Sequence, residues 1–327
     1  MLNNPVFEGP FKQEMEDFIA LKRAVGFKYD TEPGTLKRFD TYLIMHFPCL
    51  TALTREAVST WCAKTMHETI ANQCSRSSII RQFAKYLDNI GKEAWIIPSH
   101  YHPKVPKYVP HIYTTDELRR FFAETDKCHF CYEHPHRHLI MPVFFRLLFS
   151  CGLRCSEARL LKVKDVDLEK GVLSIMDSKN HNDRLVPMAD SITLRMRTYA
   201  VEVHPFPEPD RYFFPAFGEK PMTVGNIYKN FRRFLWHAGI SHTGAGPRVH
   251  DFRHTFCVYR LKTWAHQERE LMALFPLLRT YLGHQTFNET AYYLSLTADV
   301  FPYLRLKLEQ HYQDIIPSME GLSYDTN

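Results

Sequence analysis

Two histidines and an arginine stand close together in residues 249–256, which read Val-His-Asp-Phe-Arg-His-Thr-Phe. A proline at position 247 suits the first turn of a helix. On that helix His250 and Arg253 share a face, with His254 one turn beyond His250. An imidazole beside a guanidinium is suited to binding an oxyanion or a phosphate. A surface helix with a few cations would show the same pattern, so the motif needs partners elsewhere.

A second candidate cation is Arg154, in the stretch Gly-Leu-Arg-Cys-Ser-Glu at residues 152–157. It lies at a predicted turn between two apolar helices, where its head group is expected to be partly buried. A buried guanidinium needs an anion, which can be Glu157, a ligand phosphate or both. Lys179 is predicted on the polar tip of a hairpin whose strands span 171–176 and 184–188. A lysine there is also compatible with simple solvation.

A third group follows Gly283, which is expected to end one helix before another begins near Glu289. The turn between them places His284 near Tyr292 and Tyr293. Phenol, imidazole and guanidinium groups are therefore available to one site if the fold brings these segments together.

Cys128 and Cys131, followed by histidines at 134, 136 and 138, resemble half of a zinc site. No second pair stands at zinc-finger spacing, and the segment lies between two predicted helices, where a variable loop is expected. We therefore expect no metal ion, while metal binding by these side chains stays open.

The composition describes an ordinary globular protein of 327 residues, 45% hydrophobic and 24% charged. This length allows two domains. A net charge of +5 permits nucleic-acid binding without demanding it. Eight cysteines and no signal-peptide pattern predict reduced thiols in a cytoplasmic protein. The longest apolar run, 139–153, is too short to span a bilayer, so no membrane association is expected.

Hydrophobic periodicity predicts four helices within residues 1–97: 11–25, one after Pro33, one capped by Thr54, and 76–90. Residues 98–112 carry four prolines, which favour an extended linker. Residues 113–327 begin with a capping box at Thr114 and Glu117, and contain further helices around the hairpin. The expected fold is mainly α with a small β-sheet (α+β).

Basic side chains accompany the predicted fourth helix, the linker and the hairpin. A solvated surface would look similar, but these cations can also contact a phosphate backbone. The candidate DNA contacts are Arg76, Arg81, Lys85, Lys104, Lys107 and Arg184.

Taken in order, these motifs resemble the tyrosine recombinases of the phage integrase family. The motifs are Gly-Leu-Arg154-x-x-Glu157, Lys179 before Arg-Leu-Val-Pro, His250-x-x-Arg253-His254-Thr, Leu-Gly-His284, and a tyrosine nine residues later. The long interval between Arg253 and His284 is similar to that of transposon-encoded members. The resemblance implies a core-binding domain in 1–97 and a catalytic domain in 113–327.

The resemblance also implies roles. Tyr293 would be the nucleophile, giving a 3′-phosphotyrosyl intermediate, with Tyr292 as its rival; one helical step rotates a side chain by about 100°, so only one can face the phosphate. Arg154 and Arg253 would clamp the phosphate, with Glu157 holding Arg154. Lys179 would protonate the leaving group, His250 would assist the tyrosine, and His284 would donate to the phosphate. His254 is expected to give support.

The implied function is site-specific DNA strand exchange by a homotetramer on two double-stranded DNA sites, without ATP, metal or another cofactor. A type IB topoisomerase shares this chemistry, and a DNA-binding accessory protein that had lost cleavage is a further alternative. The compact size favours the recombinase over the topoisomerase, and the occupied catalytic positions argue against an inactive protein. The target sequence, the direction of the reaction and the host element stay open.

Overall fold

The computed structural model describes residues 5–103, 105, 108–176, 183–244, 246–267 and 269–296. The chain forms two compact units, Met1–Tyr108 and Val109–Asn327. The division falls within the proline-rich segment.

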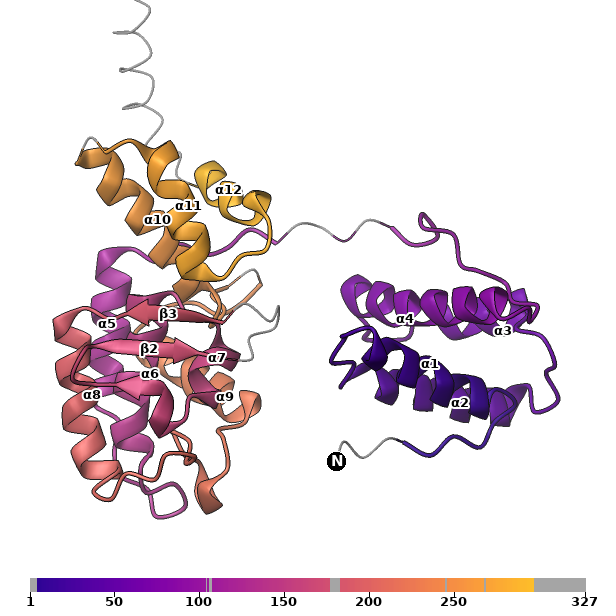
Figure 1. Ribbon diagram of the computed structural model, residues 1–327, viewed down its shortest axis with the longest axis horizontal. Helices are drawn as coiled ribbons and strands as arrows, with labels where there is room; N and C mark the ends of the chain where they lie inside the picture. Colours follow the sequence, from indigo (N-terminus) through magenta and orange to yellow (C-terminus); the bar gives the residue numbers. More distant parts are fainter. Residues whose placement is uncertain are drawn as a thin grey trace, which may run out of the picture. The chain divides into compact units, whose positions relative to one another are not determined.

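The first unit consists of four helices around a phenylalanine-rich core (Figure 1). They are α1 (Lys12–Ala24), α2 (Glu32–His46), α3 (Arg55–Cys62) and α4 (Ile70–Asn89). Thr54 caps α3 as predicted, its side chain accepting the Ala57 amide. The fourth helix begins six residues before its predicted start at Arg76, because Thr69 caps it and accepts the Asn72 amide. In its first two turns the buried residues are the polar Gln73 and Ser77, which hid this part of the helix from the periodicity.

The second unit is mainly helical with a small antiparallel sheet, so the predicted α+β class is confirmed. Its strands β1 (Val166–Asp167), β2 (Val172–Ile175) and β3 (Arg184–Pro187) pair in the order β1-β2-β3. The hairpin register places Ser174 opposite Leu185. The first strand was not predicted, since two residues are too short to show an alternating pattern. The α-helices are α5 (Thr115–Asp126), α6 (Arg137–Cys151), α7 (Cys155–Leu160), α8 (Asp190–Val203), α9 (Val224–His237), α10 (Asp251–His266), α11 (Leu271–Leu282) and α12 (Phe287–Ser295).

Aromatic side chains dominate the core of this unit, where Phe121, Phe145 and Phe252 pack within 6.1 Å of one another by ring centroid. Figure 1 shows α10, α11 and α12 gathered at one end of the unit. They share a smaller apolar cluster that includes Phe256 and Tyr293. The capping box at Thr114 and Glu117 is present as predicted. The helix expected to start near Pro247 instead begins at Asp251, so the proline lies outside its first turn.

No helix within the described ranges is both long enough and apolar enough to cross a bilayer. A final helix was predicted at 299–311, and this segment lies outside the described residues.

Candidate active site

The candidate site is built on two helix ends, each closed by a glycine with a positive φ. Gly152 ends α6 with a φ of 59°, and Gly283 ends α11 with a φ of 65°. A Cβ on Gly152 would lie 2.5 Å from the Phe256 ring, so position 152 has no room for a side chain. The last carbonyls of a helix lack intrahelical donors and carry the negative end of its dipole. Such oxygens favour cationic donors.

Arginines occupy these carbonyls, with one on each of three consecutive residues at the end of α11. Arg184 Nε donates to Tyr281 O over 2.8 Å, Arg253 Nη2 to Leu282 O over 2.7 Å, and Arg154 Nη2 to Gly283 O over 3.2 Å. Segments that lie far apart in the sequence therefore meet at one turn. We refer to residues 281–283 as the α11 turn.

Arg154 stands directly before α7 and is held by Glu157 at both its backbone and its side chain. The Arg154 amide donates to Glu157 Oε2 over 2.9 Å, and Nη1 donates to Oε1 over 2.8 Å. The Glu157 side chain is only 3% exposed, compared with 16% for Arg154. Burial would raise the pKa of Glu157, but the hydrogen bonds and charge of Arg184 outweigh it, and the net shift is downward. The carboxylate is therefore ionised at neutral pH.

Arg253 is almost completely buried, with 1% of its surface exposed. Its Nη1 donates to Gly152 O over 2.8 Å, so this arginine joins the ends of α6 and α11. Burial and the positive charge of Arg154 lower the pKa of Arg253. Two of the five N–H donors of a guanidinium serve the carbonyls, which leaves others for a ligand. The site therefore holds two close cations that an anion would stabilise.

Arg184, a predicted DNA contact, has a mostly buried side chain. Its side chain is 5% exposed, and its two terminal nitrogens donate to the two oxygens of Glu157 over 3.1 and 2.9 Å. All three of its nitrogens therefore have partners within the unit, and its contact with DNA stays a prediction. The sequence pattern did not predict these contacts, because Glu157 and Tyr281 lie 27 and 97 residues from Arg184 along the chain.

Three imidazoles line the same region. His284 is buried, and its Nδ1 lies 2.8 Å from Thr290 Oγ1. Burial and the nearby arginines, Arg253 first, lower the pKa of His284 to about 3. His250 and His254 contact each other with ring centroids 4.9 Å apart. Desolvation of the ring lowers the pKa of His250, and the positive charges of His254, Arg253 and Arg154 lower it further. His250 and His284 are therefore neutral at pH 7 and can accept or donate one proton.

Tyr293 belongs to the same cluster. Its ring is 3% exposed, stacks on His284 at 6.0 Å and lies 5.5 Å from His254. The Arg253 guanidinium and the Cys257 thiol lie close enough to the phenol to affect its pKa. Burial, with a contribution from Cys257, raises the pKa of Tyr293, so its hydroxyl is protonated at neutral pH. The contact with Cys257 was not predicted, because the thiol looked like an ordinary core residue.

Tyr292 lies beside this group at greater distance. Its ring is partly exposed, 6.4 Å from His254 and 6.0 Å from Tyr293. Of the two tyrosines, Tyr293 thus has the closer relation to Arg253 and His284. Lys179, the predicted general acid, lies outside the described residues.

The predicted DNA contacts of the first unit are not equivalent. Arg76 binds Glu68 through Nε at 2.7 Å and through Nη2 at 2.8 Å, and also donates to two backbone carbonyls. Arg81 donates to Ile97 O and Pro98 O over 2.7 and 2.9 Å. Only Lys85 of these three is classed as exposed. Both arginines thus link neighbouring loop carbonyls to α4. Lys104 and Lys107 lie outside the described residues.

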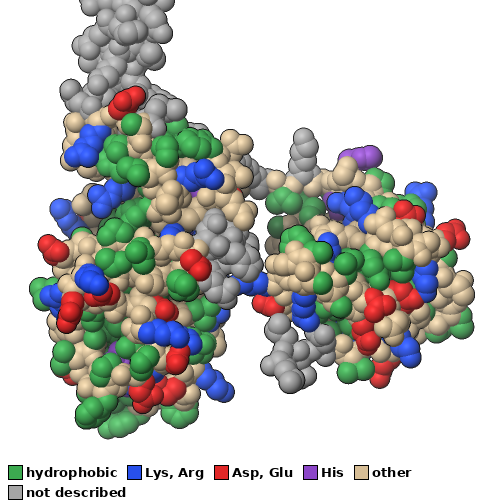
Figure 2. All heavy atoms as spheres, in the orientation of Figure 1, with side chains coloured by type: hydrophobic (Ala, Val, Ile, Leu, Met, Phe, Trp, Pro, Cys, Tyr) green, Lys and Arg blue, Asp and Glu red, His purple; other side chains and the backbone are tan. Residues whose placement is uncertain are grey.

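The visible surface does not show a single basic field. On the face drawn in Figure 2, acidic and basic side chains are interspersed on each unit. The concentration of positive charge described above is instead largely interior to the second unit.

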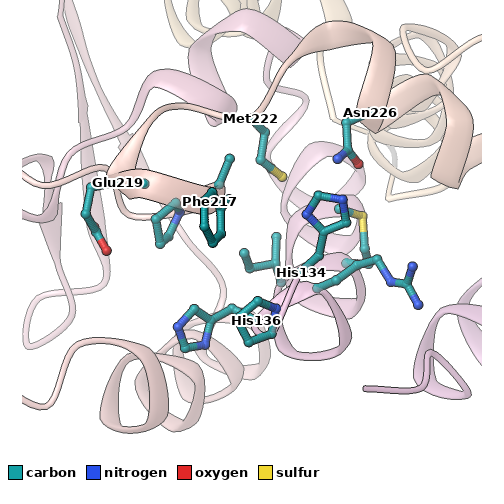
Figure 3. Close-up of a pocket in the computed structure, with 13 residues that line it drawn as sticks. His134, His136, Phe217, Glu219, Met222 and Asn226 are labelled. Atoms are coloured by element: carbon teal, nitrogen blue, oxygen red, sulfur yellow. The ribbon is translucent and has the colours of Figure 1, made fainter. Parts of the chain in front are cut away.

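The cysteine–histidine segment lies away from this cluster. His134 and His136 line a cavity of about 180 Å³ together with Phe217, Met222 and Asn226 (Figure 3). Its walls come from the loop before α6, from the loop around 215–222 and from α9. Within the described ranges, no three His, Cys, Asp or Glu side chains come together as metal ligands would.

Comparison with known proteins identifies the family. Residues 112–299 match the model of the phage integrase family. The chain is 28% identical over 315 residues to y4rB of Sinorhizobium fredii, a candidate integrase/recombinase, covering 93% of this chain and 98% of y4rB. It is 28% identical over 202 residues to the tyrosine recombinase XerA of Pyrococcus furiosus, covering 60% of this chain and 61% of XerA.

The fold is similar to that of the Tn1549 transposon integrase, solved in complex with circular intermediate DNA. The TM-score is 0.55 and the identity 18%, covering 86% of this chain and 94% of the integrase chain. The family match spans more than half of the sequence and contains the whole arginine–histidine–tyrosine cluster. The chain therefore belongs to the phage integrase family and is an enzyme of the tyrosine-type site-specific recombinases.

Proposed function

We propose that this recombinase cleaves and rejoins DNA through a covalent bond between Tyr293 and a 3′-phosphate. The observation that carries the proposal is the meeting of Arg154, Arg253, His284 and Tyr293 at the ends of α6 and α11. Tyr293 combines closeness to the buried Arg253 with stacking on His284, a histidine of the matched motif. The roles below rest on this arrangement together with the family resemblance.

The reaction begins with attack of the Tyr293 hydroxyl oxygen on the scissile phosphorus. A bond forms between that oxygen and phosphorus, and the bond from phosphorus to the 5′-oxygen breaks. The phenolic proton passes to a base, for which neutral His250 is the candidate, and the 5′-oxygen takes a proton from Lys179. The products are a 3′-phosphotyrosyl linkage and a free 5′-hydroxyl. Reversal by a 5′-hydroxyl of a second strand completes the exchange.

The two arginines stabilise charge that accumulates on the non-bridging oxygens. Fixed guanidinium donors fit this task because their geometry is set before the reaction starts. Arg154 and Arg253 are already held by backbone carbonyls at distances of 2.7–3.2 Å, so little reorganisation is needed. The phosphodiester energy is kept in the phosphotyrosyl bond, so the scheme requires neither ATP nor a metal ion.

Tyr293 must leave its apolar surroundings to reach the phosphate, because its ring is 3% exposed. Its high pKa keeps the hydroxyl protonated and poorly nucleophilic until a base and a phosphate are in place. We propose that this protects the enzyme from reaction away from DNA.

Double-stranded DNA is the proposed substrate, supported by the DNA complex of the Tn1549 integrase, which has the same fold. We assign residues 1–97 to binding of the core site, 98–112 to the linker and 113–327 to catalysis. A homotetramer on two sites is the proposed assembly. If residues after Ala298 join neighbouring subunits, truncation there abolishes assembly on DNA, as native gel electrophoresis would show; unchanged assembly would contradict this role.

The test of the proposed chemistry uses a nicked suicide duplex that carries a site selected for binding to the full chain. Loss of the short cleaved fragment traps the covalent intermediate, which denaturing gels resolve. We expect an adduct with the wild-type protein and with Tyr292→Phe, and none with Tyr293→Phe. Loss of the adduct only in Tyr292→Phe would reassign the nucleophile, and no adduct with the wild-type protein would overturn the proposal.

A further inference from the structure

A buried charged group that the proposed chemistry does not use is the guanidinium of Arg184, the first residue of β3. The reaction proposed above uses Arg154 and Arg253 but gives no role to this third arginine. Its side chain is 5% exposed, and burying a charge to this extent costs several kcal/mol unless it is well paired. Its contacts therefore have to account for its position.

Those contacts all lead to the groups that position the phosphate clamp. Two nitrogens of Arg184 bind the two oxygens of Glu157, the carboxylate that also holds the side chain and amide of Arg154. The third nitrogen donates to Tyr281 O in the α11 turn, two residues before Gly283, whose carbonyl accepts from Arg154. Arg184 thus contacts Glu157 and the α11 turn, which together hold Arg154.

The space around Gly283 shows how close this packing is. A Cβ at position 283 would lie 2.9 Å from Nη1 of Arg184 and 3.2 Å from its Cζ. His284 follows immediately, so the backbone that carries it rests against the Arg184 guanidinium. A displacement of Arg184 would therefore change the positions of both Arg154 and His284.

We propose that Arg184 is a positioning residue for strand cleavage: it fixes Glu157 and the α11 turn, and through them Arg154 and His284. The inference rests on the proposed function of this site. A lysine cannot replace it, because one ammonium cannot span both carboxylate oxygens and the Tyr281 carbonyl in the fork geometry of a guanidinium.

The experiment compares Arg184→Lys with Arg197→Lys in the full chain. Arg197 is a matched control, since its Nε and Nη2 also donate to a backbone carbonyl, that of Leu168, on an exposed part of the same unit. Single-turnover cleavage is measured at saturating DNA, with the active fraction taken from the burst amplitude. We expect the rate constant of Arg184→Lys to fall about 100-fold, in the range for a lost oxyanion donor. DNA affinity should stay within about threefold and Arg197→Lys should match the wild type.

Two altered phosphates separate positioning of the clamp from other roles. A methylphosphonate at the scissile position removes the charge that the arginines neutralise, so the deficit of Arg184→Lys relative to wild type should shrink to within about threefold. A 5′-bridging phosphorothiolate supplies a leaving group that needs no protonation, and the deficit should persist there. Rescue by the phosphorothiolate alone would overturn the proposal by placing the defect at the leaving group.

Other outcomes are equally informative. A weaker affinity with an unchanged rate constant, and a salt dependence reduced by about one phosphate contact, would make Arg184 a DNA contact and refute the proposal. A smaller active fraction with a wild-type rate constant would reduce its role to folding. An adduct with wild type but no defect in Arg184→Lys would overturn only this inference. No adduct with wild type would overturn the proposed function and this inference with it.

Discussion

Arginines have different roles in the two units of this protein. In the first unit, Arg76 faces a single carboxylate, Glu68, and Arg81 closes a loop by donating to Ile97 O and Pro98 O. In the second unit, three guanidiniums meet around one carboxylate, Glu157, and the α11 turn. The contacts are of the same kind in both places, namely short hydrogen bonds to carbonyl and carboxylate oxygens.

The difference lies in the balance of charge. The Arg76 guanidinium, binding Glu68 through side-chain hydrogen bonds, holds the pKa of that carboxyl at about 2, and the pair is neutral overall. In the second unit, the charges of Arg154, Arg184 and Arg253 exceed that of Glu157 by two. Burial and Arg154 lower the pKa of Arg253, which shows that this excess is unfavourable as it stands. A surplus of buried positive charge, rather than the presence of arginine, distinguishes the proposed phosphate site from the first unit.

The largest expected contrast is in the rate of cleavage. Replacing Arg253 by lysine keeps the charge but loses the fork that joins Gly152 O, Leu282 O and the phosphate. We expect single-turnover cleavage to fall about 1000-fold, as for removal of an oxyanion donor. Arg76→Lys should leave the rate constant unchanged. Equal rate losses in the two variants would remove the distinction between the units.

Glu157→Gln replaces the carboxylate with a neutral amide and so tests how much the surplus of positive charge destabilises the fold. The substitution preserves shape but removes the negative charge that Arg154 and Arg184 bind. Breaking a buried ion pair in this way should lower the free energy of unfolding by about 3 kcal/mol. Urea unfolding of the full chain measures the change. Glu219→Gln, which removes a more exposed partner of Arg211, should cost less than about 1 kcal/mol and is the matched control.

Acid should destabilise the second unit through His284. Its pKa in the folded protein is about 3, against 6.5 for the free group, so below pH 6.5 the unfolded chain binds the proton more readily. Stability is therefore complete above pH 6.5 and falls by about 1.4 kcal/mol per pH unit as the pH drops towards 3. Urea midpoints between pH 7.5 and 5 should drop less steeply in His284→Gln than in the wild type. The exposed His266→Gln should retain the wild-type slope, and a common slope in all three proteins would contradict the prediction.

The smallest expected effect is stabilisation by a simple divalent anion. Sulfate at about ten times its dissociation constant should stabilise the folded protein by about 1.4 kcal/mol. For a unit of this size that raises Tm by roughly 3–5 °C relative to chloride at equal ionic strength. Arg253→Lys should lose most of the shift, and Arg76→Lys should keep it. A shift that survives in Arg253→Lys would place sulfate elsewhere.

Local signals in the sequence predicted much of the fold. Thr54 and the Thr114–Glu117 capping box start helices where expected, and Gly152 and Gly283 end them. These positions could be predicted because caps and positive-φ glycines act over a few residues. The start of α4 and the two-residue β1 were missed, since neither carries an apolar repeat.

The arginine contacts could not be predicted in the same way. A helical repeat gives the face from which Arg76 or Arg81 leaves the backbone, but not the carbonyl that its long side chain reaches. Arg184 and the Tyr281 carbonyl are 97 residues apart, and only the packing of β3 against α11 brings them together. The motif order indicated which segments share a site, but it did not indicate that Arg184 binds Glu157 and the Tyr281 carbonyl.

The most direct test of the central claim is to identify the amino acid that becomes attached to DNA. The adduct trapped on the suicide duplex is digested with nuclease and trypsin, and the nucleotide-bearing peptide is sequenced by mass spectrometry. The account predicts a nucleotide on Tyr293, next to the surplus charge of Arg154 and Arg253. A nucleotide on Tyr292, or on any residue outside this cluster, would contradict it.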